Sequence, residues 1–306
     1  MKRSDQFADL QGSKRSTAPA GTDIHMRNSL KDWLERHSSE LGGIILDIDG
    51  VLLNSGRRLP GSRTLLQWLR RHGMPYVLLT NDGNHSTEEK AETLQHSGLP
   101  VSPGQIVSCG HAIVPLVQAN GFTGQAFFVM GDTGDPCYAR AAGLAPVREL
   151  ARLKQCAGVI VGEDHYAWEP VINAVVNFFI DWPQAALIVP NPDEFYPGHT
   201  FKIHIAAGAV ARFIQRVLEA YGLKIEPIYL GKPYPPIFKM AHRHLEQQRG
   251  SAIPADTILM VGDNLNSDIA GGRKMAFRTA LLLTGVTTPS VLAGAGIRPG
   301  LVFEKL

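Results

Sequence analysis

The sequence predicts an α/β protein with a doubly wound parallel sheet and a second α/β unit inserted into it as a cap domain. Residues 44–53, IILDIDGVLL, form an apolar run typical of a strand buried on both faces of a parallel sheet. Strand and helix patterns alternate over the first 120 residues. A second alternation begins near Gly121, which predicts the additional unit.

The composition is that of a soluble globular protein. With 306 residues, 44% hydrophobic and 19% charged, the chain is long enough for two domains. A net charge of +2 favours neither nucleic acid nor an acidic membrane, and no apolar segment is long enough to span a bilayer. Residues 1–24 lack the apolar stretch of a signal peptide. The three widely spaced cysteines contain no CxxC pair that would suggest zinc or redox chemistry, so we expect them to be reduced core residues. We therefore expect a cytoplasmic protein.

The N-terminal half of the main unit can be predicted element by element. Residues 1–40 are expected to be an extension, with a polar leader to about residue 25 and a short helix at 28–37 capped by Asn28 or Ser29. The unit itself is assigned to 41–120. Its expected elements are a strand from Ile44 with Asp47 and Asp49 at its carboxyl end before a turn at Gly50, a helix from Ser62 to about Gly73, a strand at 76–79 and a helix from Ser86 to Gly98. Ser86 and Glu89 are expected to form a capping box.

The inserted cap is assigned to 121–226 and the second part of the main unit to 227–306. The cap is expected to contain strands at 126–130, 157–161 and 185–189 and helices at 135–142, 168–181 and 206–221. The chain is then expected to return to the first sheet at 228–232, followed by a helix at 235–248, a strand at 257–261 and an edge strand at 279–283.

Polar residues recur at the ends of the predicted strands of the main unit. They are Asp47 and Asp49, Thr80, Lys232, and Asp263 with Asp268. Because the carboxyl ends of neighbouring parallel strands meet at one edge of the sheet, we expect these residues to line one pocket. One carboxylate can attack phosphorus, a second can protonate the leaving oxygen, and a third can help to bind Mg²⁺. Thr80 and Lys232 would bind the phosphoryl oxygens.

The charges favour a cation at this edge. Asp47 and Asp263 brought together would repel each other, which raises their pKa values unless a cation neutralises them. Taken alone, each motif has an ordinary explanation: Gly262-Asp263 as a turn or cap, Thr80-Asn81 as a loop cap, and Lys232 as a surface lysine. The apolar strand around Asp47 and Asp49 makes the functional interpretation of the whole set stronger.

Four motifs in this order and spacing resemble those of the haloacid dehalogenase superfamily of phosphohydrolases. They are IILDIDG at 44–50, LLTN at 78–81, GKP at 231–233 and GDNLNSD at 262–268. The chain is more similar still to the NagD-type branch, subfamily IIA, which has a large α/β cap between the second and third motifs. Further matching segments are VGEDHY at 161–166, NPD at 191–193, AAGAV at 206–210 and TGVT at 284–287.

The resemblance implies a role for each matching residue. It implies that Asp47 is the nucleophile that forms an aspartyl-phosphate and that Asp49 is the general acid and base. Magnesium would be held by the side chains of Asp47 and Asp263 and the main-chain carbonyl of Asp49. The resemblance also implies that Thr80 and the amide of Asn81 bind the phosphoryl group, that Lys232 neutralises it, and that Asp268, with Asn264 beside it, supports the site.

The resemblance further implies that the cap loop around Asn191 and Asp193 lies over the leaving group and sets specificity. A closing cap favours a small phosphorylated metabolite, such as a nucleotide or sugar phosphate, and the cap is also a candidate contact for a homo-oligomer. Two positions depart from the family pattern. Pro190 stands where a threonine is usual, and Asp82 puts a negative charge beside the expected phosphate site.

The sequence thus predicts a magnesium-dependent phosphomonoester hydrolase. Two alternatives stay open: phosphoryl transfer to a second substrate, and a binding or regulatory protein that keeps the fold without turnover. The full set of Asp47, Asp49, Thr80, Lys232 and Asp263 argues against the latter. Carbon–halogen hydrolysis is disfavoured because an alkyl halide needs no acid on its leaving group, so Asp49 would have no task.

Overall fold

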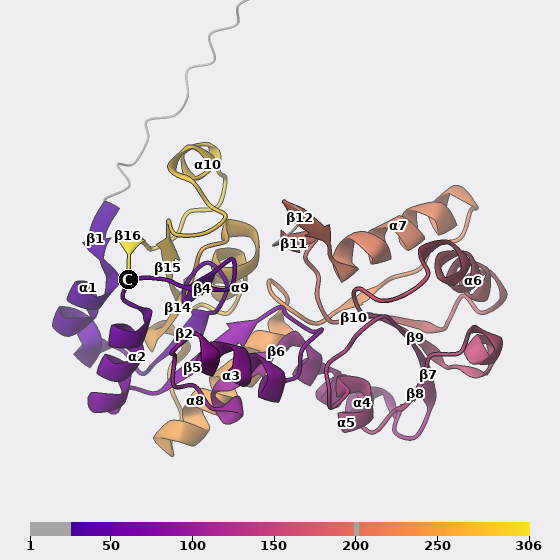
Figure 1. Ribbon diagram of the computed structural model, residues 1–306, viewed down its shortest axis with the longest axis horizontal. Helices are drawn as coiled ribbons and strands as arrows, with labels where there is room; N and C mark the ends of the chain where they lie inside the picture. Colours follow the sequence, from indigo (N-terminus) through magenta and orange to yellow (C-terminus); the bar gives the residue numbers. More distant parts are fainter. Residues whose placement is uncertain (1–25, 199–201) are drawn as a thin grey trace, which may run out of the picture.

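The computed structural model describes residues 26–198 and 202–306, so the predicted leader at 1–25 lies outside the described residues. A seven-stranded, entirely parallel sheet forms the first half of the molecule (Figure 1). Its strands, in spatial order, are β1 (Met26–Ser29), β16 (Leu301–Lys305), β15 (Arg278–Leu282), β14 (Ile258–Gly262), β2 (Gly43–Asp47), β5 (Tyr76–Thr80) and β6 (Ile106–Ser108).

Helices cover both faces of this sheet, which confirms the predicted doubly wound fold. One face packs against α1 (Leu30–His37), α2 (Ser62–Arg71) and α3 (Thr87–His96). The other packs against α8 (Pro235–Arg249), with α9 (Ala270–Lys274) and α10 (Pro289–Gly294) on the same side. Because β2 and β5 are buried at every position, their apolar runs contact helices on both sides.

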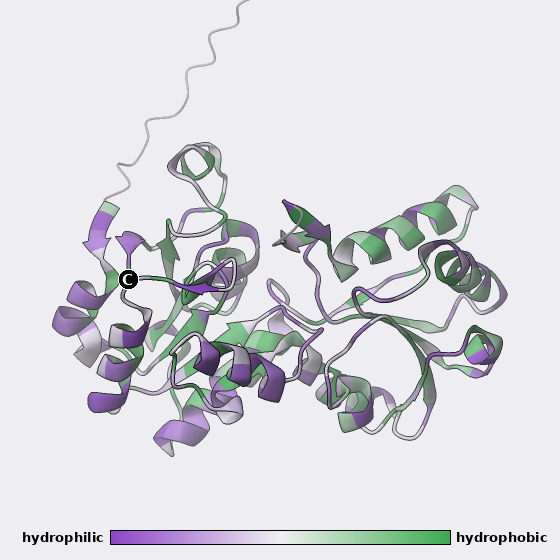
Figure 2. Ribbon diagram, viewed as in Figure 1, coloured by the Kyte–Doolittle hydropathy of each residue, from purple (hydrophilic) through white to green (hydrophobic). Residues whose placement is uncertain are grey.

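A second parallel sheet forms the other half of the molecule. Its strands, in spatial order, are β13 (Ile228–Tyr229), β10 (Ala186–Val189), β9 (Gly158–Val161), β7 (Ala126–Met130) and β8 (Ala145–Val147). Helices α6 (Trp168–Asp181) and α7 (Ala207–Ala220) cover one face, and α4 (Ile113–Asn120) and α5 (Tyr138–Ala141) cover the other. Figure 2 shows green, hydrophobic strands inside each half and purple on the outer helices α1, α2 and α3.

Most of the predicted elements agree with the structure, including the capping box at Ser86 and the Ser29 cap of α1. Three expectations were wrong. Residues 228–229 do not return to the first sheet, because β13 pairs with β10 of the second. The strand at 278–282 is not an edge, because β16 and β1 lie beyond it. The helix expected at 135–142 is the shorter α5.

The second sheet includes β13 as a strand and is covered on one face by α4. Both elements lie just outside the range 121–226 assigned to the cap, so the cap boundary stays a prediction. Two antiparallel hairpins have no counterpart in the sequence analysis: β3 (Leu53–Asn54) with β4 (Arg57–Arg58), and β11 (Phe195–Pro197) with β12 (Ile203–Ile205). Among the described residues, no helix is both long and apolar enough to cross a membrane.

Candidate active site

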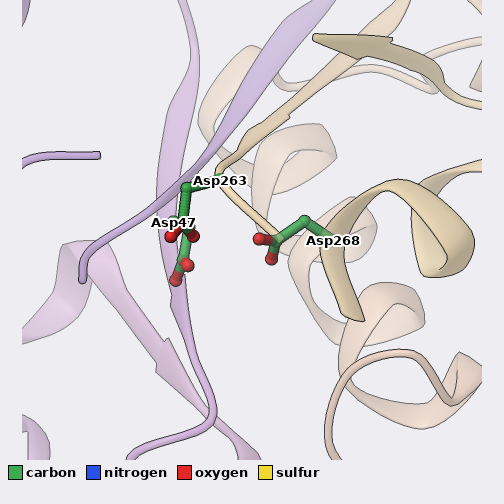
Figure 3. A group of neighbouring side chains, drawn as sticks. All are labelled: Asp47, Asp263 and Asp268. Atoms are coloured by element: carbon green, nitrogen blue, oxygen red, sulfur yellow. The ribbon is translucent and has the colours of Figure 1, made fainter. Parts of the chain in front are cut away.

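Three aspartates converge at the carboxyl ends of two neighbouring strands. Asp47 is the last residue of β2, Asp263 follows β14, and Asp268 lies in the short helical turn Leu265–Ile269. Figure 3 shows their carboxylates grouped together, and one ligand oxygen from each lies within 4.8 Å of the others. All three side chains are buried. The structure thus brings together three of the residues that the sequence placed at one sheet edge.

The register of the sheet explains this convergence. Strands β2 and β14 pair directly, with Leu46 opposite Val261, so both chains leave the sheet at the same level. Asn264 then caps the helical turn, because its side-chain oxygen accepts hydrogen bonds from the backbone amides of Asn266 and Ser267. The backbone amide of Asn264 donates a hydrogen bond to Oδ2 of Asp268 at 3.1 Å, which fixes the position of that carboxylate.

Lys232 completes the cluster from the loop after β13. Its Nζ lies 2.7 Å from Oδ1 of Asp47 and 2.7 Å from Oδ1 of Asp268. Burial alone would lower the pKa of Lys232, but the charges of Asp268 and Asp47 outweigh it and raise that pKa above its usual value. Lys232 is therefore a buried cation held between two carboxylates.

Two glycines allow loops to approach Asp263 closely. A Cβ on Gly285 would lie 1.8 Å from Oδ2 of Asp263, and a Cβ on Gly50, whose φ is +88°, would lie 2.2 Å from the same atom. The amide of Val286 donates to this oxygen at 2.6 Å. The loop from 284 to 287, noted in the sequence without a role, therefore supports Asp263.

The electrostatics of the cluster fit a divalent cation. Burial, together with the charge of Asp268, raises the pKa of Asp47 well above its usual range and that of Asp263 to about 7. When ionised, three carboxylates and one ammonium leave two uncompensated negative charges. Carboxylate oxygens are the ligands that Mg²⁺ prefers, so the residues present fit this ion in charge and in donor type.

Thr80 is the last residue of β5, the neighbour of β2 on its other side, and Asn81 follows it. The Thr80 hydroxyl oxygen accepts a hydrogen bond from the amide of Asp82 at 3.0 Å. The Asn81 side chain bonds both backbone groups of Lys232, accepting from its N–H at 2.7 Å and donating to its carbonyl at 3.0 Å. It also donates to Asp193 of the cap. Asn81 thus links the Lys232 loop to the cap, a role that sequence reasoning missed.

Asp49 lies apart from the buried aspartates, and its side chain is 52% exposed. Its Oδ2 accepts a hydrogen bond at 3.1 Å from Lys90 of α3, which also donates to Asp82 at 2.8 Å. Burial would raise the pKa of Asp82, but the charges of Lys90 and His85 hold it well below its usual value. The negative charge noted at Asp82 is therefore compensated, which the sequence could not show.

The two predicted cap residues lie in a loop that is bonded to the main unit. Asn191 accepts from the amide of Asp193 at 2.9 Å, and Asp193 in turn accepts from Asn81. Burial raises the pKa of Asp193. The carbonyl of Pro190 accepts from the amide of Gly231 at 2.9 Å, so the residue before Lys232 is held against this loop.

Glu163 is a further buried carboxylate, and the sequence analysis gave it no role. Its Oε1 accepts from Asn191 at 2.7 Å and from the Ala207 amide at 3.0 Å, and its Oε2 accepts from Asn84 at 2.7 Å. Burial raises its pKa to about 7. A glutamate two residues after the buried strand β9 was the available signal. Glu163 joins the cap to the loop after β5.

Comparison with known proteins agrees with this geometry. Two family profiles match, haloacid dehalogenase-like hydrolase over residues 44–145 and HAD-hydrolase-like over 229–306. The chain belongs to the haloacid dehalogenase superfamily. The predicted NagD-type branch and the prediction of a phosphatase are confirmed by the relatives described next.

Two relatives are similar over most of their length. The chain is 26% identical to dihydroxyacetone phosphatase of Corynebacterium glutamicum over 86% of this chain and 88% of that protein. It is 27% identical to the ribonucleotide monophosphatase NagD of Escherichia coli, over 86% and 96% respectively. Among solved structures, a possible sugar phosphatase from Cytophaga hutchinsonii matches with a TM-score of 0.77 and 26% identity, over 92% of this chain and 98% of the other.

Proposed function

We propose that this protein is a magnesium-dependent phosphomonoesterase that acts on a small phosphorylated metabolite through an aspartyl-phosphate. The observation that carries the proposal is the buried cluster of Asp47, Asp263, Asp268 and Lys232 at the carboxyl ends of β2 and β14. In this cluster the nucleophile Asp47 lies beside the positive charge of Lys232 and beside carboxylates that can bind a cation. This combination suits phosphoryl transfer better than a protein that only binds a phosphorylated ligand.

In the first step, Oδ2 or Oδ1 of Asp47 attacks phosphorus and forms an acyl-phosphate bond, while the bond from phosphorus to the ester oxygen breaks. Asp49 gives its proton to that departing oxygen, so the product leaves as a neutral alcohol. The side chain of Asp49 is 52% exposed and that of Asp47 is 10% exposed, which suits this role because the leaving group is the part of the substrate that extends toward solvent.

In the second step, Asp49 accepts a proton from water as the water attacks phosphorus, and the bond from phosphorus to Asp47 breaks. Inorganic phosphate leaves and Asp47 is restored as a carboxylate. Lys232 reduces the negative charge on the phosphoryl oxygens, and Asp268 holds its ammonium in place at 2.7 Å. The Thr80 hydroxyl and the Asn81 amide would donate to the same oxygens.

Asp47, Asp263 and the main-chain carbonyl of Asp49 would hold the magnesium ion. When bound, it supplies positive charge that offsets the repulsion between carboxylates and phosphate and orients the phosphoryl group. Asp268, which the structure places in the same cluster, lies near enough to help hold the ion or its water.

A small substrate follows from the cap loop. Asn191 and Asp193 are held close to the Lys232 loop through Asn81, so we propose that this loop contacts the leaving group. The relatives named for dihydroxyacetone phosphate and ribonucleotide substrates support a sugar phosphate or nucleotide. The unpaired cysteines suit a cytoplasmic location.

The test is release of inorganic phosphate from a panel of small phosphomonoesters, with and without magnesium. The native protein is compared with Asp47→Asn and with Asp32→Asn, a matched control at an exposed position of α1. We expect magnesium-dependent release that Asp47→Asn abolishes and Asp32→Asn retains. No release from any ester by native protein that binds magnesium would overturn the proposal.

A further inference from the structure

A second group of charged side chains lies beside the aspartate cluster, on the side of Asp49. Lys90, in the first turn of α3, places its Nζ 3.1 Å from Oδ2 of Asp49 and 2.8 Å from Oδ2 of Asp82. The Lys90 side chain is only 12% exposed, although Asp49 is half exposed. An ammonium that is this buried and bonded to two carboxylates has a fixed position.

Asp82 anchors this arrangement. Its Oδ1 accepts hydrogen bonds from the amides of Asn84 at 3.1 Å and His85 at 3.2 Å, and the His85 ring bonds the same carboxylate. Its own amide donates to the Thr80 hydroxyl. Asp82 is therefore fixed within the loop that follows β5. Lys90 is held between Asp82 of this loop and Asp49.

Asp49 is far less constrained. Among the residues that the structure describes, Lys90 is the one side chain that bonds the Asp49 carboxylate. The capping box of Ser86 and Glu89 fixes the start of α3, in the same turn as Lys90. The position of Asp49 thus depends on Lys90 of α3 and, through Lys90, on Asp82 in the loop after β5.

We propose that Lys90, held by Asp82, is a positioning residue that orients Asp49 for proton transfer to the leaving oxygen. Lys90 donates to Oδ2, so the transferable proton is carried on Oδ1 of Asp49. As the ester bond breaks, the O–H bond at Oδ1 breaks, the proton passes to the ester oxygen, and the ammonium stabilises the carboxylate that is left. This inference rests on the proposed phosphatase function and assigns a purpose to the unusual charge at Asp82.

The inference predicts a dependence on the leaving group that a general loss of stability would not produce. An aryl ester such as 4-nitrophenyl phosphate has a leaving group that needs little protonation, whereas an alkyl ester such as glycerol phosphate needs an acid. A variant in which Asp49 is poorly oriented should therefore lose activity on the alkyl ester selectively. Full removal of a general acid costs about 10²–10⁴-fold, so misplacement should cost about 10–100-fold.

The experiment measures kcat and KM of native protein and Lys90→Met on both esters, with Lys239→Met, an exposed lysine of α8, as the matched control. We expect Lys90→Met to lower kcat on the alkyl ester about 10–100-fold and on the aryl ester less than about threefold, with KM nearly unchanged. Lys90→Arg, which keeps a charged donor, should recover part of the loss. Lys239→Met should resemble the native protein on both esters.

A second variant guards against misfolding of Lys90→Met. Asp82→Asn keeps the shape and the Oδ1 acceptor of the anchor but removes its charge, and it should show the same selective loss to a smaller extent. Equal losses on the two esters, or no loss on either, in a folded variant would overturn the inference while leaving the phosphatase function standing. Native protein inactive on both esters would instead overturn the function on which the inference rests.

Discussion

The substitution Glu163→Gln tests the physical account of the contact between cap and main unit. Burial raises the pKa of Glu163 from its ordinary value of 4.5 to about 7, so the folded protein binds a proton here that the unfolded chain releases between these pH values. The stabilisation from this proton is fully present below pH 4.5 and is lost as the pH rises through about 7. The difference between 4.5 and 7 corresponds to about 3 kcal/mol of unfolding free energy.

The glutamine side chain introduced by Glu163→Gln is neutral at every pH, so the substitution should remove this dependence. Its oxygen can still accept from Asn191 and the Ala207 amide, and the Asn84 side chain can turn to accept from the new amide group. Urea unfolding is measured from pH 4 to 8 for the native protein and the variant, with Glu169→Gln, an exposed residue of α6, as control.

We expect the native protein to lose about 3 kcal/mol relative to Glu163→Gln between pH 4.5 and 8, with most of the change near pH 5–7. The comparison isolates Glu163, because the buried aspartates titrate equally in both proteins. A free-energy difference that stays constant over this range, or that grows in favour of the native protein at high pH, would refute the assigned effect of burial.

Three further outcomes follow from the aspartate cluster. Lys232→Met should lower the unfolding free energy by about 3–5 kcal/mol, because it leaves the fully buried Asp268 without its cation; unchanged urea unfolding would contradict this. Magnesium at 100 times its Kd should stabilise the native protein by about 2.7 kcal/mol, seen as a raised Tm. Gly285→Ala should weaken magnesium binding in calorimetry because its Cβ would displace Asp263, whereas Gly294→Ala, whose Cβ meets open space, should bind normally.

Local signals in the sequence were sufficient to predict much of the fold. The apolar run before Asp47 matches β2, the Ser86 capping box matches the start of α3, and the aspartates at the ends of β2 and β14 do meet at one sheet edge. These features depend on periodicity, caps and the geometry of parallel strands, all of which act over a few residues.

Features that depend on distant partners could not be predicted in this way. The short segment at 228–229 has no pattern that distinguishes one sheet from the other, and its pairing with β10 is set by tertiary packing. The same is true of Asn81, whose side chain bonds Lys232 across 151 positions of sequence. Lys90 and Glu163 look like ordinary charged residues until burial and their partners are known.

The central claim is that Asp47 carries the phosphoryl group during turnover. The most direct measurement is a rapid acid quench of protein mixed with magnesium and a hydrolysed ester, followed by peptide mass spectrometry. The account predicts one acid-stable, hydroxylamine-sensitive phosphoryl group on the peptide that contains Asp47, and none in Asp47→Asn. Rapid phosphate release without any phosphorylated Asp47, and unimpaired in Asp47→Asn, would contradict it.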